Sequence, residues 1–141
     1  MSVYQLSIKN IVVHCSDTPN DREVTAEEIH HWHKENNWSG IGYHAVIRRN
    51  GVVESGRPIY WKGSHVGRVG RNHDTLGVCL VGRDEYTEAQ LKALRNLIEY
   101  WQESFPKAAV VGHCDLDGYK TCPNFDAGRW FETGEFAKSP V

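Results

Sequence analysis

The sequence predicts an α/β fold, a single domain in which a mixed central sheet is flanked by helices on both faces. Short apolar runs rich in β-branched residues occupy residues 11–14, 76–81 and 108–111 and lack polar alternation, which is typical of strands buried on both faces. Segments with helical patterns lie between these runs and can cover the sheet. The 141 residues contain no linker, repeat or change of composition, which predicts one domain over residues 1–141.

The first helix is predicted to begin at Ala26. Thr25 and Glu28 have the spacing of a capping box, in which the threonine hydroxyl accepts a hydrogen bond from the Glu28 amide and the carboxylate reaches back. Val24 and Ile29 flank the box as a hydrophobic staple. The start of this helix is therefore defined by its own sequence.

A hairpin follows the first helix. Asn50-Gly51 separates the strand-like residues 43–49 from residues 52–54, and this dipeptide favours a two-residue turn. A short helix near Trp130 is expected as the last element of the chain.

The long second helix is predicted between the second and third apolar runs. Thr87 and Gln90 form another capping box, Tyr86 and Leu91 form its staple, and Pro106 ends the helix. One apolar stripe follows the helical spacing of three and four residues. Its members are Leu91, Leu94, Leu97, Ile98, Trp101 and Phe105.

Composition limits the class of protein. The chain carries 16 Lys and Arg against 18 Asp and Glu, a net charge of −2, without runs of like charge, so nucleic acid is not an expected partner. No apolar stretch is long enough to span a membrane, and the N-terminus lacks the pattern of a secretion signal. We therefore expect a cytoplasmic protein that does not bind membranes, and its four cysteines are expected to be reduced.

Three residues with metal-ligating side chains fall where strands meet loops. His14 ends the first apolar run, His113 ends the third, and Cys122 follows nine residues later. Two imidazoles and one thiolate suit zinc, and three protein ligands leave a fourth tetrahedral position open, as in catalytic sites. From the residues alone, the alternative is two structural histidines and a small buried cysteine.

Other constellations compete with this site. His30 and His33 share a face of the first helix, where a solvated surface is expected more often than a metal site. A thiol hydrolase that uses Cys122 or Cys114 with a histidine also fits the sequence. A basic rim around residues 57–71 would suit an anionic ligand, although ordinary loop solvation is favoured. It comprises Arg57, Lys62, Arg68 and Arg71, opposed by Asp74.

Short motifs follow one another in a characteristic order over nearly the whole chain. They are residues 11–16 (IVVHCS), 42–44 (GYH), 63–65 (GSH), Asn72 before 76–78 (LGV), 112–115 (GHCD) and 120–123 (KTCP). This ordered set resembles the zinc-dependent N-acetylmuramoyl-L-alanine amidases, most closely their phage-lysozyme branch, which shares its fold with peptidoglycan recognition proteins. Each motif alone is weak, whereas the ordered set is specific.

The resemblance implies Zn²⁺ as the cofactor and bacterial peptidoglycan as the substrate, cleaved at the amide between N-acetylmuramic acid and L-alanine. The implied residues are the zinc ligands His14, His113 and Cys122, the catalytic groups Tyr43 and Lys120, and the substrate-binding residues His65 and Asn72. It also implies a monomeric, endolysin-like enzyme that reaches the wall through another protein's membrane lesion. The alternatives are a non-catalytic peptidoglycan-binding module and a cytoplasmic amidase that recycles wall fragments.

Two features of the chain bear on these alternatives. The segment from His113 to Cys122 is one residue longer than the family pattern, and Asp117-Gly118 is the natural place for its turn. The recycling branch typically carries an aspartate where this chain has Cys122. The phage-like branch therefore fits better.

Overall fold

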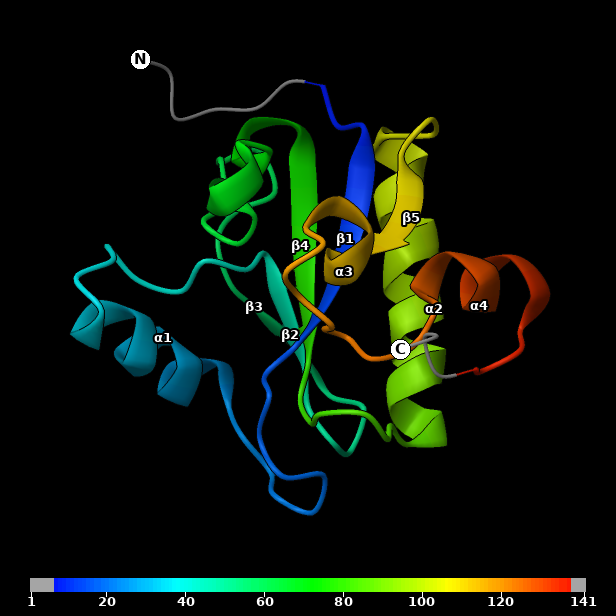
Figure 1. Ribbon diagram of the computed structural model, residues 1–141, viewed down its shortest axis with the longest axis horizontal. Helices are drawn as coiled ribbons and strands as arrows, with labels where there is room; N and C mark the ends of the chain where they lie inside the picture. Colours follow the sequence, from blue (N-terminus) through cyan, green and yellow to red (C-terminus); the bar gives the residue numbers. More distant parts are fainter. Residues whose placement is uncertain (1–6, 138–141) are drawn as a thin grey trace.

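The computed structural model describes residues 7–137 and contains a five-stranded sheet in the order β3-β2-β4-β1-β5 (Figure 1). Strand β1 pairs in parallel with β4 and β5, β2 pairs in parallel with β4, and only β3 is antiparallel. The elements are β1 (Asn10–Cys15), α1 (Ala26–Glu35), β2 (Ala45–Ile47), β3 (Val53–Ser55), the 3₁₀ turns η1 (Gly67–Val69) and η2 (Asn72–Asp74), β4 (Thr75–Leu80), α2 (Glu88–Ser104), β5 (Ala109–Gly112), α3 (His113–Leu116) and α4 (Ala127–Thr133). The predicted mixed sheet is confirmed.

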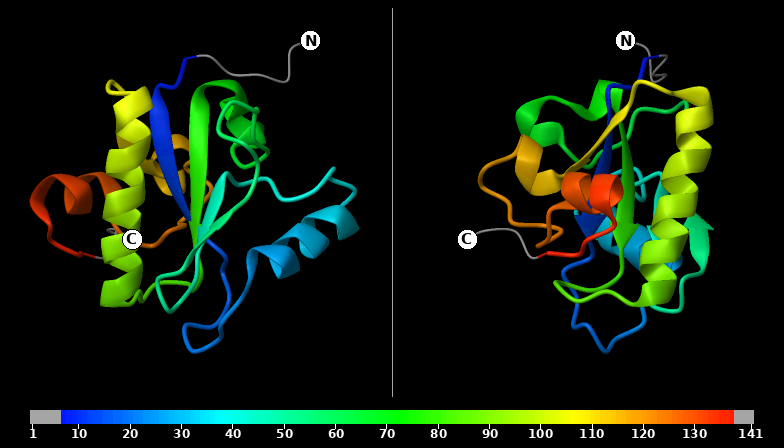
Figure 2. Two further views of the ribbon diagram at one scale, coloured as in Figure 1. Left: turned by 180° about the vertical axis from the view of Figure 1, so that it is seen from behind. Right: turned by 90° about the vertical axis from the view of Figure 1, so that its right-hand side faces the viewer.

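Helices cover both faces of the sheet. Helix α2 packs on the face that carries Val13 and Leu80, whereas α1 contributes Ile29 to a smaller cluster with Val46 and Cys79. Side chains of a strand point alternately to opposite faces, so Cys79 and Leu80 belong to different layers. The side view shows α2 on one side of the sheet and α3 on the other (Figure 2). The predicted three-layer arrangement is confirmed.

Helix α1 begins at Ala26, as predicted, but its capping box is only half formed. The Glu28 amide donates to the Thr25 hydroxyl at 3.2 Å, while the Glu28 carboxylate pairs with Arg22 instead of reaching back. The carboxylate of Glu54 accepts from the amide of Ala26 at 2.9 Å. A residue from β3 thus stabilises the helix end, and sequence spacing does not reveal this contact.

Helix α2 has the complete predicted capping box. Thr87 accepts from the Gln90 amide, and the Gln90 side chain accepts from the Thr87 amide, both at 3.0 Å. The same glutamine is fully buried and donates to the carbonyls of Val81 and Ile47. Its side chain therefore joins the helix start to the sheet as well as capping the helix.

The predicted hairpin is present, but its turn is one residue longer than expected. The Arg48 amide donates to the Val52 carbonyl and the Gly51 amide to the Arg48 carbonyl, which leaves three residues in the loop. Gly51 has φ +88°, whereas Asn50 does not have the positive φ that a two-residue type I′ turn requires. The Glu23 carboxylate accepts from the amides of Arg49 and Asn50, so a contact with another segment stabilises the longer turn.

The C-terminal part adds two short helices. Helix α4 contains Trp130, as predicted, whereas α3 was not expected between His113 and Cys122. The Asp117-Gly118 turn is confirmed by a bond from the Lys120 amide to the Asp117 carbonyl. All four cysteines are free thiols. Within residues 7–137, no helix is long and apolar enough to cross a membrane.

Candidate metal centre

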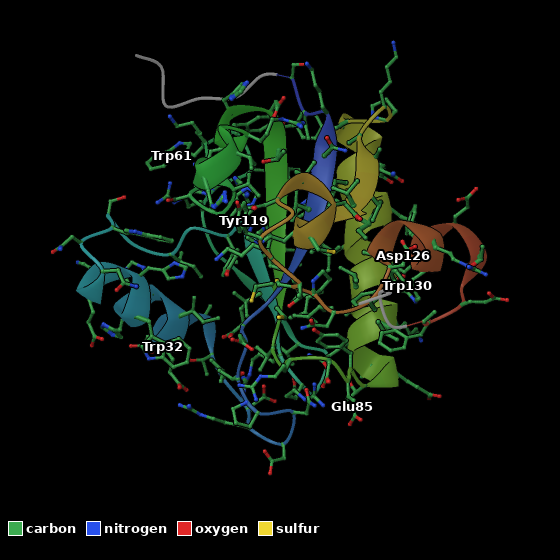
Figure 3. All side chains as sticks on the ribbon, in the orientation of Figure 1. Trp32, Trp61, Glu85, Tyr119, Asp126 and Trp130 are labelled. Atoms are coloured by element: carbon green, nitrogen blue, oxygen red, sulfur yellow. The ribbon has the colours of Figure 1, made fainter. Side chains whose placement is uncertain are left out.

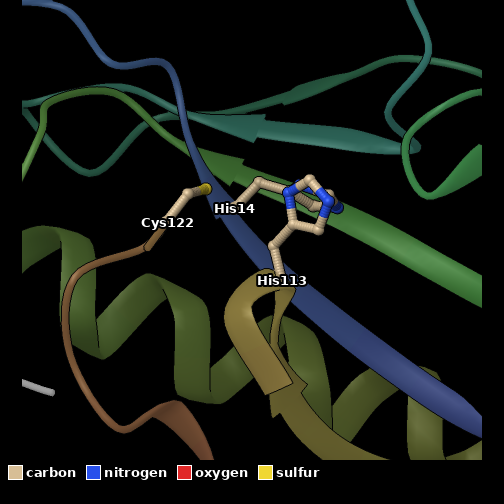
Figure 4. A group of neighbouring side chains, drawn as sticks. All are labelled: His14, His113 and Cys122. Atoms are coloured by element: carbon tan, nitrogen blue, oxygen red, sulfur yellow. The ribbon is translucent and has the colours of Figure 1, made fainter. Parts of the chain in front are cut away.

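The sheet brings His14, His113 and Cys122 together. Val13 of β1 pairs with Gly112 of β5, so the residues that follow each of them are neighbours. The ring centroids of His14 and His113 are 4.5 Å apart, and one ligand atom from each of the three residues lies within 4.8 Å of the others. Figure 4 shows the Cys122 sulfur directed towards the two rings. The described residues contain no other such cluster.

Backbone contacts fix the position of Cys122. The Cys15 amide donates to the Cys122 sulfur at 2.9 Å, and the Cys114 amide donates to the Cys122 carbonyl at 2.9 Å. The neighbouring Cys15 thiol and burial raise the pKa of the Cys122 thiol well above its usual value, although the hydrogen bond from the Cys15 amide acts in the opposite direction. The metal-free protein therefore holds Cys122 as a thiol, and a bound cation would have to displace its proton. The first turn of α3 is capped by Asp115, whose carboxylate accepts from the Gly112 amide at 2.7 Å.

The donor set fits zinc. Burial lowers the pKa of His14 and of His113, so both rings are neutral near pH 7 and carry a lone pair for a cation. Two imidazoles and a thiolate are common zinc ligands, and three of them leave a coordination position for water or substrate. The hydrogen bond from Cys15 supplies the supporting contact typical of a metal-bound thiolate.

His65 lies directly behind His14. The Nε2 atom of His14 and the Nδ1 atom of His65 are 2.8 Å apart, and the Nε2 atom of His65 is 3.1 Å from the Thr75 hydroxyl. Both nitrogens of His65 are thus engaged inside the protein, and the residue is 8% exposed. The structure places His65 against a predicted metal ligand.

Tyr43 lies beside the cluster, on the segment that leads into β2. Its ring centroid is 5.0 Å from that of His14 and 5.5 Å from that of His33. Burial raises the pKa of Tyr43 well above its usual value, with the neighbouring Cys79 and Cys122 thiols as further causes. The phenol therefore keeps its proton at neutral pH and can donate a hydrogen bond.

Lys120 ends the turn after α3 and is exposed. Its positive charge contributes to the lowered pKa of His113, after burial as the main cause. The turn is tied to η1 by Arg68, whose guanidinium lies 3.6 Å from the Asp117 carboxylate and 4.1 Å from the centroid of the Tyr119 ring. Figure 3 shows Tyr119 between the α3 segment and η1.

Asn72 braces the loop that carries His65. Its side-chain oxygen accepts from the amides of His65 and Val66, at 3.0 and 2.8 Å. The structure therefore places Asn72 one step behind His65 rather than next to the three candidate ligands.

The basic rim is largely engaged in contacts within the protein. Arg71 pairs with Asp74 at 2.8 Å, and Arg57 donates to the carbonyls of Ile41 and Lys62. A cavity of about 610 Å³ lies beside Arg57 and Lys62, but none of the three candidate ligands lines it. Nothing in this arrangement requires an anionic ligand.

His30 and His33 do not form the solvated surface that was favoured for them, so that interpretation was wrong. The Nδ1 atom of His30 accepts from the Ile41 amide at 3.0 Å, and that of His33 accepts from the Gly42 amide at 2.9 Å. Both rings are half-buried and hold α1 against the segment that leads to Tyr43. The reason is the close return of the chain after α1, which spacing within the helix does not predict.

The buried ring of His44 leads to a prediction of how the free energy of unfolding depends on pH. Burial lowers its pKa to about 4, from 6.5 in an exposed histidine. Its Nδ1 accepts from the Gly77 amide and its Nε2 bonds the Trp61 carbonyl, so the folded protein holds the neutral ring. Between these pKa values only the unfolded chain binds the proton, and stability therefore falls as the pH falls below 6.5.

The expected loss attributable to His44 is about 1.4 kcal/mol per pH unit, or about 3 kcal/mol in total by pH 4. Urea unfolding of the metal-free protein at several pH values measures the sum over all buried histidines. An NMR titration of the His44 ring isolates this residue. A His44 ring that titrates near 6.5 in the folded protein would contradict the prediction.

Comparison with known proteins identifies the family. Residues 4–125 match the family described as N-acetylmuramoyl-L-alanine amidase. The chain belongs to this amidase family. Among curated relatives, the endolysin of Enterobacteria phage K11 is 42% identical over 135 residues, which cover 90% of this chain and 87% of that protein.

Solved structures support the same conclusion for the amidase. The N-acetylmuramoyl-L-alanine amidase LysC from Clostridium intestinale URNW aligns with a TM-score of 0.75 and 30% identity, over 84% of this chain and 77% of that one. Drosophila PGRP-LB aligns with a TM-score of 0.76 over 93% of this chain and 81% of that one, and at 24% identity it shows the shared fold. The resemblance inferred from the motifs is thus confirmed.

Sequence reasoning about the amidase missed two supporting contacts. Thr75 sits at the start of β4 and contacts His65, and the Cys15 amide contacts Cys122. Cys15 follows the predicted ligand His14 in the sequence, and this position could have indicated a supporting role. Thr75 gave no such signal, because its contact depends on how the loop before β4 packs against that strand.

Proposed function

We propose that this amidase hydrolyses the amide between N-acetylmuramic acid and L-alanine in bacterial peptidoglycan, with zinc held by His14, His113 and Cys122. The observation that carries the proposal is the convergence of these three ligand atoms within 4.8 Å in a chain 42% identical to a phage endolysin. The endolysin relatives support a role in phage lysis over fragment recycling. The proposal takes residues 1–141 as one catalytic domain, acting as a monomer from the cytoplasm.

The reaction needs an activated water and stabilisation of the negative charge that develops on the carbonyl oxygen. A bound zinc ion supplies both, since it acidifies water and polarises a carbonyl. The Cys122 thiolate reduces the formal charge of the site, so a second cation near the oxyanion adds stabilisation that the ligands do not give.

Lys120 is proposed to supply the second cation near the oxyanion, and Tyr43 is proposed to supply a hydrogen-bond donor. The positive charge of Lys120 is a lesser cause of the lowered pKa of His113, after burial, and this supports a cation near that proposed ligand. Tyr43 lies beside His14 and keeps its phenolic proton, so it serves as a hydrogen-bond donor towards substrate or water. The two groups belong to different segments, Tyr43 to the one that leads into β2 and Lys120 to the one that follows α3.

Product analysis tests the bond that is cleaved. Purified peptidoglycan treated with the protein is expected to release stem peptides with new L-alanine amino groups, while the glycan strands keep their length. Amine labelling and mass spectrometry measure the peptides, and a reducing-sugar assay measures the glycan. New reducing ends without new amines would mark a glycosidase, and wall binding without release of peptide would mark a binding module.

A further inference from the structure

A chain of hydrogen bonds runs from His14 into the interior. The Nε2 atom of His14 lies 2.8 Å from Nδ1 of His65, Nε2 of His65 lies 3.1 Å from the Thr75 hydroxyl, and that hydroxyl lies 2.7 Å from the Arg71 carbonyl. His14, His65 and Thr75 are 1%, 8% and 0% exposed. Water therefore has little access to the chain of bonds.

The last bond determines the direction of all the others. A backbone carbonyl only accepts, so the single hydroxyl proton of Thr75 is donated to Arg71. The hydroxyl oxygen must then accept from His65, which puts the His65 proton on Nε2. A charged imidazolium is costly away from water, so both rings are neutral, and the unprotonated Nδ1 of His65 accepts from His14. His14 then carries its proton on Nε2, and its Nδ1 is free to bind a cation.

The surroundings hold the His65 ring in this position. A Cβ atom on Gly77 would lie 2.7 Å from Nδ1 of His65, and one on Gly63 would lie 2.6 Å from its Cδ2 atom. Asn72 accepts from the His65 amide and fixes the backbone. The ring therefore occupies a slot that any larger residue at either glycine would obstruct.

We propose that Thr75 is a positioning residue for the metal centre: through His65 it fixes the proton of His14 on Nε2 and leaves Nδ1 of His14 as the metal ligand. The inference rests on the proposed zinc set and adds to it a residue two hydrogen bonds away from the ligand. It also gives His65 a role in orienting His14, in place of the substrate contact that the family resemblance implies.

The proton position is measured first in the wild-type, metal-free protein. Nitrogen-15 NMR of the imidazoles distinguishes a protonated ring nitrogen from an unprotonated one. His14 and His65 are each expected to show a protonated Nε2 and an unprotonated Nδ1. A protonated Nδ1 on His14 would overturn the proposal without any variant.

Two variants then test the part played by Thr75. Thr75→Val keeps the shape and removes the hydroxyl, whereas Thr75→Ser keeps the hydroxyl. We expect zinc affinity, measured by competition with a chromogenic chelator, to fall about 10- to 100-fold in Thr75→Val and to stay near wild type in Thr75→Ser. The His14 tautomer is expected to become mixed in Thr75→Val only.

The matched control is Thr133→Val, which removes a similar hydroxyl-to-carbonyl bond on α4, away from the candidate ligands. Its zinc affinity is expected to be unchanged. Wild-type zinc affinity and an unchanged His14 tautomer in Thr75→Val would overturn the role of Thr75. Full zinc occupancy in Cys122→Ala would instead overturn the ligand set, so the two failures are distinguishable.

Discussion

Replacing Cys122 with alanine is expected to remove the bound metal and the hydrolase activity together. The thiolate is one of the three proposed ligands, and His14 and His113 alone would form an incomplete zinc site. Losing the Lewis acid removes several kcal/mol of transition-state stabilisation, so the rate is expected to fall by about a thousandfold or more. Elemental analysis should show about one zinc per chain in the wild type and much less in the variant.

Cys114 provides the control for this experiment. It lies on α3, eight residues before Cys122, and is outside the ligand group. Cys114→Ala is expected to keep its zinc, so the pair of variants separates a ligand from a neighbouring thiol. If the wild type and Cys114→Ala were both active without zinc, the result would instead support the thiol hydrolase that the sequence left open.

Replacing Lys120 with alanine is expected to lower kcat about a hundredfold while the zinc content stays unchanged, the size of effect seen when one oxyanion donor is lost. The proposed role of the ammonium is to attract the negative charge that is present mainly in the transition state, so KM should change little. Steady-state kinetics on soluble wall fragments, together with elemental analysis, measure the two quantities separately.

Lys92 is the matched control for Lys120. It is an exposed lysine on α2, which covers the face of the sheet opposite α3, and Lys92→Ala is expected to keep full activity. Equal activity in Lys120→Ala and Lys92→Ala, with zinc bound in both, would show that Lys120 has no part in the reaction. A loss of zinc from Lys120→Ala would show that the lysine supports the site rather than the reaction.

Local sequence signals predicted most of the fold. The buried strands and both long helices follow from apolar patterning and from capping residues such as Thr25 and Thr87, because these effects act over a few residues. The hairpin turn was wrong by one residue, since the Glu23 carboxylate stabilises the longer loop from outside the hairpin. Helix α3 was missed because its four residues are too few to show periodicity.

The sequence predicted which residues form the candidate metal site, but it did not predict the hydrogen bonds that hold those residues in place. His14 and His113 end apolar runs, and a strand end is a position that sequence reveals. The bond from His65 to Thr75, and those from His30 and His33 to backbone amides, arise only when a helix or strand packs against the loop next to it in the chain. Spacing within one helix or strand contains no information about such contacts.

The parallel pairing of β1 determines when the protein can fold during synthesis. Asn10 pairs with Ala109 across 99 residues, and the Cys15 amide meets the Cys122 sulfur across 107. Contacts of such long sequence separation form slowly, because a large loop must close before they contribute any stability. During synthesis, β1 can pair with β4 before β5 has been made, whereas the three candidate ligands can come together only after Cys122 has left the ribosome.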